Sequence, residues 1–231
     1  MKKLADMFNI PIENTVFFEH ALTHPSYTKE NNLEYTTCYE RLEFLGDAVL
    51  KLAISDILYN KYPEYPEGNM SKIRSIIVSD ATLFEVAEEL GLSELIKLGR
   101  HEEKQGCRKL ESVCACAFEA VLGAYYLDGK FIELKDFIAQ KFTSYIEDVD
   151  KNFEKFNAKA LLQEYTQGKS KKTPEYKLVE EVGPAHKKVF EVEVWYEGEC
   201  LAKGSGKTKK EAEQKCAYEA CMKLGIKSCQ K

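Results

Sequence analysis

Three acids on one face of an otherwise apolar helix constrain this chain more than any other feature of its sequence. In the segment CYERLEFLGDAVL, the acids are Glu40, Glu43 and Asp47. Read as a helix, they stand at i, i+3 and i+7 and share a face. The remaining faces carry core-type residues, namely Leu42, Phe44, Leu45, Val49 and Leu50. Because burying an unpaired carboxylate costs on the order of several kcal/mol, positive charge is expected against this face.

Two sources of that positive charge are open. A further acid, Glu119, lies in the apolar segment CAFEAVLGAYYLD. If its helix packs beside Glu43 and Asp47, three carboxylates converge and could bind Mg²⁺ or Mn²⁺. Such an ion lowers the pKa of a bound water and stabilises charge that develops on phosphorus. Alternatively, Arg41, Lys51 or another base neutralises the acids within an ordinary helix.

The sequence pattern changes near residue 157. Before it, apolar residues recur every three or four positions and predict helices over 16–22, 42–58, 73–90, 112–127 and 131–146, with breaks such as KYPEYPEGN. After it, the pattern predicts a helix over 158–166, a loop over 167–174, strands near 176–181, 190–196 and 199–203, and a last helix capped by Thr208 with Glu211. Residues 1–157 carry a formal charge of −9 and residues 158–231 carry +4. We therefore predict an acidic helical body followed by a basic α-β-β-β-α module.

Secreted and membrane proteins are not expected from this sequence. The eight cysteines form no Cys-x-x-Cys pair and no zinc-finger spacing, so we expect free thiols and a reducing, cytoplasmic location. No apolar run approaches the roughly 18 residues that a membrane span needs. Asp6 and Pro11 interrupt the N-terminal MKKLADMFNIP too early for a signal peptide.

Several segments, in their order along the chain, resemble the bacterial ribonuclease III family. YERLEFLGDAVL resembles the family's signature, HALTHPSY an upstream block, PEGNMSKIRS the segment between the two acidic helices, and AFEAVLGAYYLD the second acidic helix. The C-terminal part resembles a double-stranded-RNA-binding domain. The resemblance implies a multidomain fold, with an all-α ribonuclease III endonuclease domain over residues 5–150. A small α+β (α-β-β-β-α) double-stranded-RNA-binding domain would follow over residues 157–226.

The resemblance also implies an activity and the residues that carry it. Family members are homodimers that hydrolyse phosphodiesters in double-stranded RNA with Mg²⁺, for which Mn²⁺ can substitute, and leave 5′-phosphate and 3′-hydroxyl ends. Processing of ribosomal and messenger RNA precursors is the family expectation. Glu43, Asp47 and Glu119 match metal ligands, and Asp47 and Glu119 match the two acids most closely tied to catalysis. Glu40 and Glu67 match acids of a catalytic valley between two subunits.

One position departs from the family pattern. Where the second acidic helix usually carries Asp as a further ligand, this chain has Cys116. A thiol is a poor ligand for a hard cation, and its reference pKa of roughly 8.5 leaves it mostly neutral at pH 7. An active enzyme could place water or a neighbouring oxygen there, or could need more metal or favour Mn²⁺. The alternative is a non-catalytic double-stranded-RNA-binding regulator, which the retention of the five other acids argues against.

The C-terminal module suits double-stranded RNA for a physical reason. A-form RNA hides its base edges in a deep groove, so proteins read its shape, 2′-hydroxyls and phosphates, which disfavours duplex DNA as a substrate. Lysines at the start of the last predicted helix are expected to bind phosphates through charge and free backbone N–H groups. The candidate RNA-binding residues are Gln163, Glu164, His186, Lys207, Lys209 and Lys210. A solvated lysine face is the alternative. His20 and His24 are expected to hold a helix end that Pro25 stops.

Overall fold

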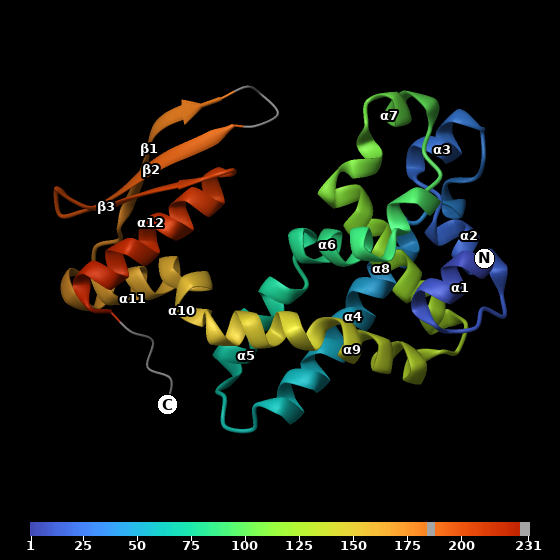
Figure 1. Ribbon diagram of the computed structural model, residues 1–231, viewed down its shortest axis with the longest axis horizontal. Helices are drawn as coiled ribbons and strands as arrows, with labels where there is room; N and C mark the ends of the chain where they lie inside the picture. Colours follow the sequence, from blue (N-terminus) through green and yellow to red (C-terminus); the bar gives the residue numbers. More distant parts are fainter. Residues whose placement is uncertain (184–187, 227–231) are drawn as a thin grey trace. The chain divides into compact units, whose positions relative to one another are not determined.

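The computed structural model describes residues 1–183 and 188–226. The chain divides into two compact units, Met1–Asp148 and Val149–Lys231. The first unit is helical, as predicted (Figure 1). Its α-helices are α1 (Lys2–Phe8), α2 (Thr15–Ala21), α3 (Pro25–Glu30), α4 (Glu40–Lys61), α5 (Glu67–Ile77), α6 (Asp80–Leu90), α7 (Arg100–Lys104), α8 (Glu111–Leu127) and α9 (Phe131–Lys151). The unit boundary falls within α9. Short 3₁₀ turns lie at η1 (Tyr35–Thr37), η2 (Leu92–Leu95) and η3 (Cys107–Lys109).

Helix α8 forms the centre of the first unit because it is apolar on all sides. Its only charged residues are Glu111, in the first turn, and Glu119. Helices α2, α4 and α6 pack against it. The rings of Phe118 and Tyr125 on α8 contact Phe8 of α1, with ring centroids 6.1 Å and 5.2 Å away. A single mid-helix carboxylate is therefore set in the most apolar helix of the unit.

Helices α4 and α8 cross with their backbones in contact. A Cβ on Gly46 of α4 would overlap the carbonyl oxygen of Glu119, and one on Gly123 of α8 would overlap the carbonyl oxygen of Leu42. Only glycine fits at these two positions, because backbone atoms fill the space that a side chain would need. The crossing brings the acidic face of α4 beside Glu119.

The segment predicted as one helix over 73–90 is two helices, so that prediction was wrong. Helix α5 ends at Ile77 and α6 begins at Asp80. Between them Ser79 has an extended backbone, and its hydroxyl donates to the carbonyl of Ile76 at 2.8 Å. The apolar spacing continues across the break, whereas a serine followed by an acid is a helix-start signal. Helix α5 also begins at Glu67, inside the stretch expected to be a loop.

His24 holds the start of a helix, which fits its expected structural role. Its Nδ1 accepts a hydrogen bond from the backbone N–H of Ser26 at 3.0 Å and caps α3. Pro25 is the first residue of α3 and does not end α2, because its fixed φ and missing N–H suit a helix start. Burial lowers the pKa of His24, which favours the neutral ring that can accept this bond.

The second unit has the predicted α-β-β-β-α order, preceded by the short α10 (Phe153–Phe156). Its elements are α11 (Ala158–Ser170), β1 (Glu175–Val182), β2 (Val189–Tyr196), β3 (Glu199–Gly206) and α12 (Lys209–Leu224). The strands form an antiparallel sheet in the order β1-β2-β3, and α11 and α12 pack on one face of it (Figure 1). Helix α11 extends into the predicted loop over 167–174.

Strand β2 confirms the strand predicted near 190–196 and turns one face to the core. Val192, Val194 and Tyr196 are buried, whereas Phe190 is half-buried. Thr208 caps α12 as predicted, since its Oγ1 accepts from the N–H of Glu211 at 3.1 Å.

The described part of the chain contains no helix that is long and apolar enough to cross a membrane. Its cysteines are all free thiols.

The α4–α8 crossing generates a stability prediction. Helix propensity alone favours alanine over glycine by about 0.8–1.0 kcal/mol. Overpacking costs about 1–3 kcal/mol, and at Gly46 the obstacle is backbone that cannot give way. We expect Gly46→Ala to lower the free energy of unfolding by at least about 1 kcal/mol, measured by chemical denaturation. Gly68→Ala on α5 is the control, because no atom lies within 4 Å of its Cβ position. Equal stability of the two variants would contradict the steric argument.

Candidate functional site

An open pocket of about 550 Å³ is lined by residues from α4, α6 and α8, and its polar lining is mainly acidic. The lining residues are Glu40, Glu43, Phe44, Asp47, Lys51, Val78, Asp80 and Glu119. The structure thus brings together four of the acids singled out from the sequence. It adds Asp80, which the sequence analysis did not select.

The acids reach the pocket through local geometry. Glu43 and Asp47 are one turn apart on α4 and flank Gly46, so the crossing with α8 lies between them. Glu119 is one turn before Gly123 on α8, on the side that faces α4. All three side chains are half-buried.

Glu119 and Glu43 hold protons more tightly than ordinary carboxyls. Burial, together with the negative charges of Asp47, Glu43 and Asp80, raises the pKa of Glu119 to about 8. Burial also raises the pKa of Glu43. Both shifts arise mainly from burial, and the negative charge of neighbouring acids adds to them.

A base does neutralise part of the site, as the alternative interpretation of the sequence proposed. Lys51 Nζ lies 2.8 Å from Asp47 Oδ2, one turn away on the same helix. Exposed i,i+4 pairs of this kind contribute only about 0.3–0.5 kcal/mol. Lys51 is therefore easily displaced from Asp47. Arg41 does not line the pocket.

Cys116 lies beside Glu43 but is not among the residues that line the acidic pocket. Burial raises the pKa of the thiol, and so do its interaction with Glu43 and the negative charges of Glu119 and Asp80. The thiol therefore stays neutral at pH 7, as expected. Cys116 thus adds neither charge nor a hard oxygen beside the acids of the pocket.

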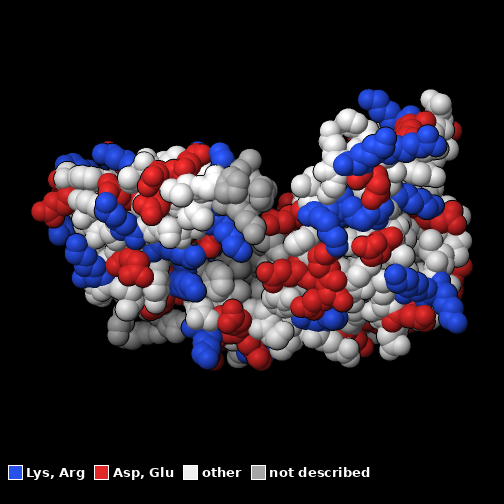
Figure 2. All heavy atoms as spheres, turned by 45° about the horizontal axis from the view of Figure 1, so that its top comes forward, with Lys and Arg blue, Asp and Glu red and all other residues white. Residues whose placement is uncertain are grey.

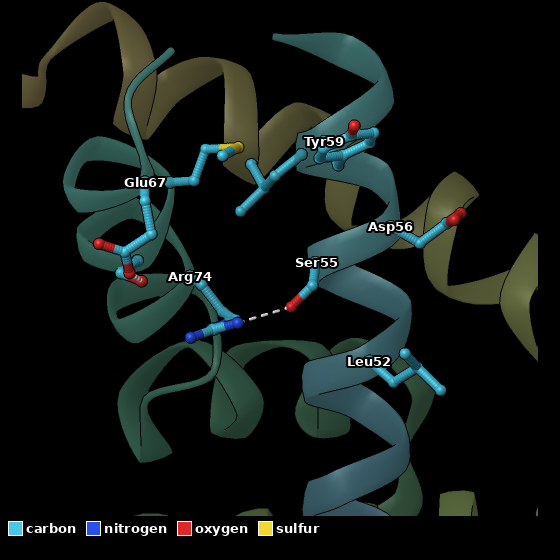
Figure 3. A pocket seen from close by; sticks show the side chains of 9 residues that line it. Leu52, Ser55, Asp56, Tyr59, Glu67 and Arg74 are labelled. Atoms are coloured by element: carbon cyan, nitrogen blue, oxygen red, sulfur yellow. Dashed lines mark hydrogen bonds between the residues drawn. The ribbon is translucent and has the colours of Figure 1, made fainter. Parts of the chain in front are cut away.

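The two remaining predicted acids lie differently. Glu40 lines the acidic pocket and accepts from the Tyr35 hydroxyl. Glu67 lies apart, in a second pocket of about 380 Å³ between α4 and α5 (Figure 3). There it accepts from Ser71 Oγ at 2.5 Å, while Arg74 on the same helix donates to Ser55 of α4 at 2.7 Å. Within one chain, Glu67 does not join the other acids.

The acidic pocket fits a hard divalent cation in donor type and charge. Its carboxylate oxygens are the ligands that Mg²⁺ and Mn²⁺ prefer. The raised pKa of Glu119 shows negative charge that a cation would relieve. In the described residues, no three His, Cys, Asp or Glu side chains already stand in an arrangement that could hold an ion. Rotation of these half-buried side chains would therefore accompany binding.

The described residues among the predicted RNA contacts lie on α11 and around the start of α12. Gln163 and Glu164 are exposed on α11, and Lys207, Lys209 and Lys210 are exposed at the start of α12. Lys209 is held in place, since its Nζ lies 3.3 Å from Glu181 and 5.6 Å from the ring centroid of Phe190. His186 falls outside the described residues. Figure 2 shows Lys and Arg mixed with Asp and Glu over the visible surface, so the charge is locally interleaved.

Sequence reasoning missed two residues of this region. Asp80 was hidden by the prediction of one continuous helix, although the Ser79–Asp80 pair was a usable helix-start signal. Phe44 was counted as a core residue, yet its side chain is 83% exposed at the edge of the pocket. Helical periodicity assigns a residue to a face but does not say which faces are covered.

Comparison with known proteins covers both units. A family model described as ribonuclease-III-like matches residues 14–146, and a model of the double-stranded RNA binding motif matches residues 158–224. Curated proteins named Ribonuclease 3 from Streptococcus pneumoniae, serotype 19F strain G54 and serotype 2 strain D39, are 43% identical over 227 residues. These alignments cover 98% of this chain and 97% of each relative.

Solved structures give a similar result for the first unit. Two structures of the nuclease domain of ribonuclease III from Campylobacter jejuni are 31% identical and have TM-scores of 0.57 and 0.55. Each match covers 62% of this chain and 96% of the solved chain. The first is described as showing flexibility in a region involved in dimer formation of that nuclease domain.

Glu119 makes the stability of the cation-free protein depend on pH. Its pKa in the folded chain, about 8, lies above the ordinary 4.5, so the folded state binds this proton more tightly. The stability that the group contributes is complete below pH 4.5 and is lost as the pH rises to about 8. We expect Glu119→Gln, which cannot ionise, to lose less stability than the unmodified protein over this range. Melting temperatures in EDTA measure this, with Glu85→Gln on α6 as a control outside the pocket. Parallel curves for the unmodified protein and Glu119→Gln would contradict the prediction.

Proposed function

The chain belongs to the ribonuclease III family, and from this premise we propose that it cleaves double-stranded RNA at the acidic pocket by divalent-cation-dependent phosphodiester hydrolysis. It is a ribonuclease III enzyme with a double-stranded-RNA-binding domain. The proposed products carry 5′-phosphate and 3′-hydroxyl ends. The proposed domain limits are 5–150 for the nuclease and 157–226 for the RNA-binding domain.

The observation that carries this proposal is the meeting of Glu43, Asp47 and Glu119 at one open pocket with too little positive charge. Asp47 and Glu119 are the proposed catalytic residues, and all three acids are the proposed cation ligands. When bound, Mg²⁺, or Mn²⁺ in its place, supplies positive charge for the reacting phosphate and lowers the pKa of a coordinated water. Cys116 lies beside Glu43, and its thiol is a poor ligand for such a cation.

The second unit is proposed to bind the RNA duplex. Lys207, Lys209 and Lys210 present positive charge at a helix start, which suits backbone phosphates. Gln163 and Glu164 on α11 are proposed to meet 2′-hydroxyls, and His186 is proposed to enter the next minor groove. Because these contacts read shape and phosphates, binding should depend weakly on sequence and strongly on salt.

We propose that the enzyme acts as a homodimer. Phe44 is 83% exposed and adjoins a pocket of about 720 Å³ that is lined by Phe17, Tyr35, Leu127 and others. A two-fold dimer buries the same patch on both copies. In the proposed dimer, the exposed ring of each copy inserts into the pocket of the other copy. Within one chain, Glu67 lies in a different pocket from the other acids. This separation fits a catalytic valley whose acids come from both subunits.

The cellular setting is also a proposal. Free thiols in the described residues favour a cytoplasmic location. Precursors of ribosomal and messenger RNA with long duplex segments are the proposed substrates, because shape recognition selects duplex length and not base order.

A cleavage assay tests the proposed function. The purified protein is incubated with a long RNA duplex in Mg²⁺, in Mn²⁺ and in EDTA. We expect cleavage only with a divalent cation, and a fall of at least about 100-fold in Glu119→Gln, since a group that stabilises the transition state is lost. Glu85→Gln is the control. Binding of the duplex without cleavage in either metal would support a non-catalytic RNA-binding regulator.

The dimer proposal predicts that Phe44→Asp yields monomers. Loss of a central aromatic contact costs about 2 kcal/mol or more, so the dissociation constant should rise by at least roughly 30-fold. Analytical ultracentrifugation measures it. Met222→Asp is the control, because Met222 is a 59% exposed apolar residue on α12 and lies outside both this patch and the pocket of Glu67. A dimer that survives Phe44→Asp would contradict the proposed interface.

A further inference from the structure

Asp80 lies in the acidic pocket without having been selected by any sequence pattern. We infer that Asp80 is a further cation ligand, which adds a fourth carboxylate to Glu43, Asp47 and Glu119 and supplies the oxygen that Cys116 does not. The inference rests on the proposed function of the same pocket.

The position of Asp80 is fixed by the packing of its helix. The break at Val78 and Ser79 makes Asp80 the first residue of α6. Leu83, Val86 and Ala87 are buried on the face of α6 that packs against α8. This packing holds the first turn of α6 at the same pocket that Glu119 enters from α8.

The Asp80 carboxylate is also available to a ligand. In the part of the chain that the structure describes, it makes no hydrogen bond or ion pair, and the residue is exposed. Lys51, the base that lines the pocket, is already paired with Asp47. An acid that stands unpaired beside three others adds repulsion, which a bound cation would turn into attraction.

Electrostatic coupling supports the same placement. The charge of Asp80 contributes to the raised pKa of Glu43, of Glu119 and of the Cys116 thiol. These three groups lie on α4 and α8, the two helices that cross beside the pocket. Cys116, next to Glu43, offers no oxygen to a cation.

A structural role for Asp80 is the competing explanation. An acid in the first turn favours the positive end of a helix dipole and stabilises the helix. That contribution does not depend on a divalent cation. The two roles therefore differ in whether the loss of the carboxylate changes cation binding.

The test measures Mn²⁺ binding to the metal-stripped full-length protein by the electron paramagnetic resonance signal of free Mn²⁺. We expect Asp80→Asn to weaken binding by at least about tenfold, in the range seen when groups that support a metal site are removed. Glu85→Gln, on the same helix but outside the pocket, should bind Mn²⁺ like the unmodified protein. Adding Cys116→Asp to Asp80→Asn should restore affinity, since it places a carboxylate beside Glu43. The Mn²⁺ concentration needed for half-maximal RNA cleavage should change in parallel.

The outcomes separate this inference from the proposed function. If Glu119→Gln abolishes Mn²⁺ binding and cleavage while Asp80→Asn binds Mn²⁺ normally, the inference is wrong and the proposed function stands. If Asp80→Asn only lowers the melting temperature, equally in EDTA and in Mn²⁺, Asp80 serves helix α6 alone and the inference is again wrong. If the unmodified protein neither binds Mn²⁺ nor cleaves the duplex, both fail.

Discussion

The backbone contact between α4 and α8 is the constraint on which the site depends. Helices usually pack about 8–10 Å apart, with side chains between their axes. Here Gly46 and Gly123 remove the side chains at the crossing, so the two backbones touch. Glu43 and Asp47 on one helix and Glu119 on the other then share a pocket because they flank that contact. The glycines bind nothing themselves, but they set the distance over which the acids interact.

This closeness has an electrostatic consequence for the folded chain. Several carboxylates share a partly buried pocket with one lysine. The pKa of Glu43 and, most clearly, the pKa of Glu119 therefore lie above the ordinary value of a carboxyl group. Clusters of like charge destabilise the folded state, and they are typical of sites that bind a ligand of opposite charge. The neutral thiol of Cys116 lowers the number of competing charges, and Asp80 adds one from a different helix. In the proposed site, Asp80 would therefore provide the carboxylate that the position of Cys116 lacks.

The second unit depends on local features, and not on net charge, to bind double-stranded RNA. The chain as a whole has a formal charge of −5, yet lysines gather at the start of α12, where backbone N–H groups also point outward. Thr208 fixes that helix start, and Val192, Val194 and Tyr196 fix the sheet behind it. Recognition of duplex shape needs a rigid spacing of contact points more than a large net charge.

The sequence by itself determined those features that follow from local periodicity and capping. It predicted the helices around 42–58 and 112–127, the strand near 190–196 and the cap at Thr208. It also predicted that Glu43, Asp47 and Glu119 would converge if their helices packed together. It did not predict the break before Asp80, the exposure of Phe44 or the separate pocket of Glu67. Only tertiary structure decided these, because each depends on which faces of distant elements come into contact, and helical periodicity is the same for a covered and an uncovered face.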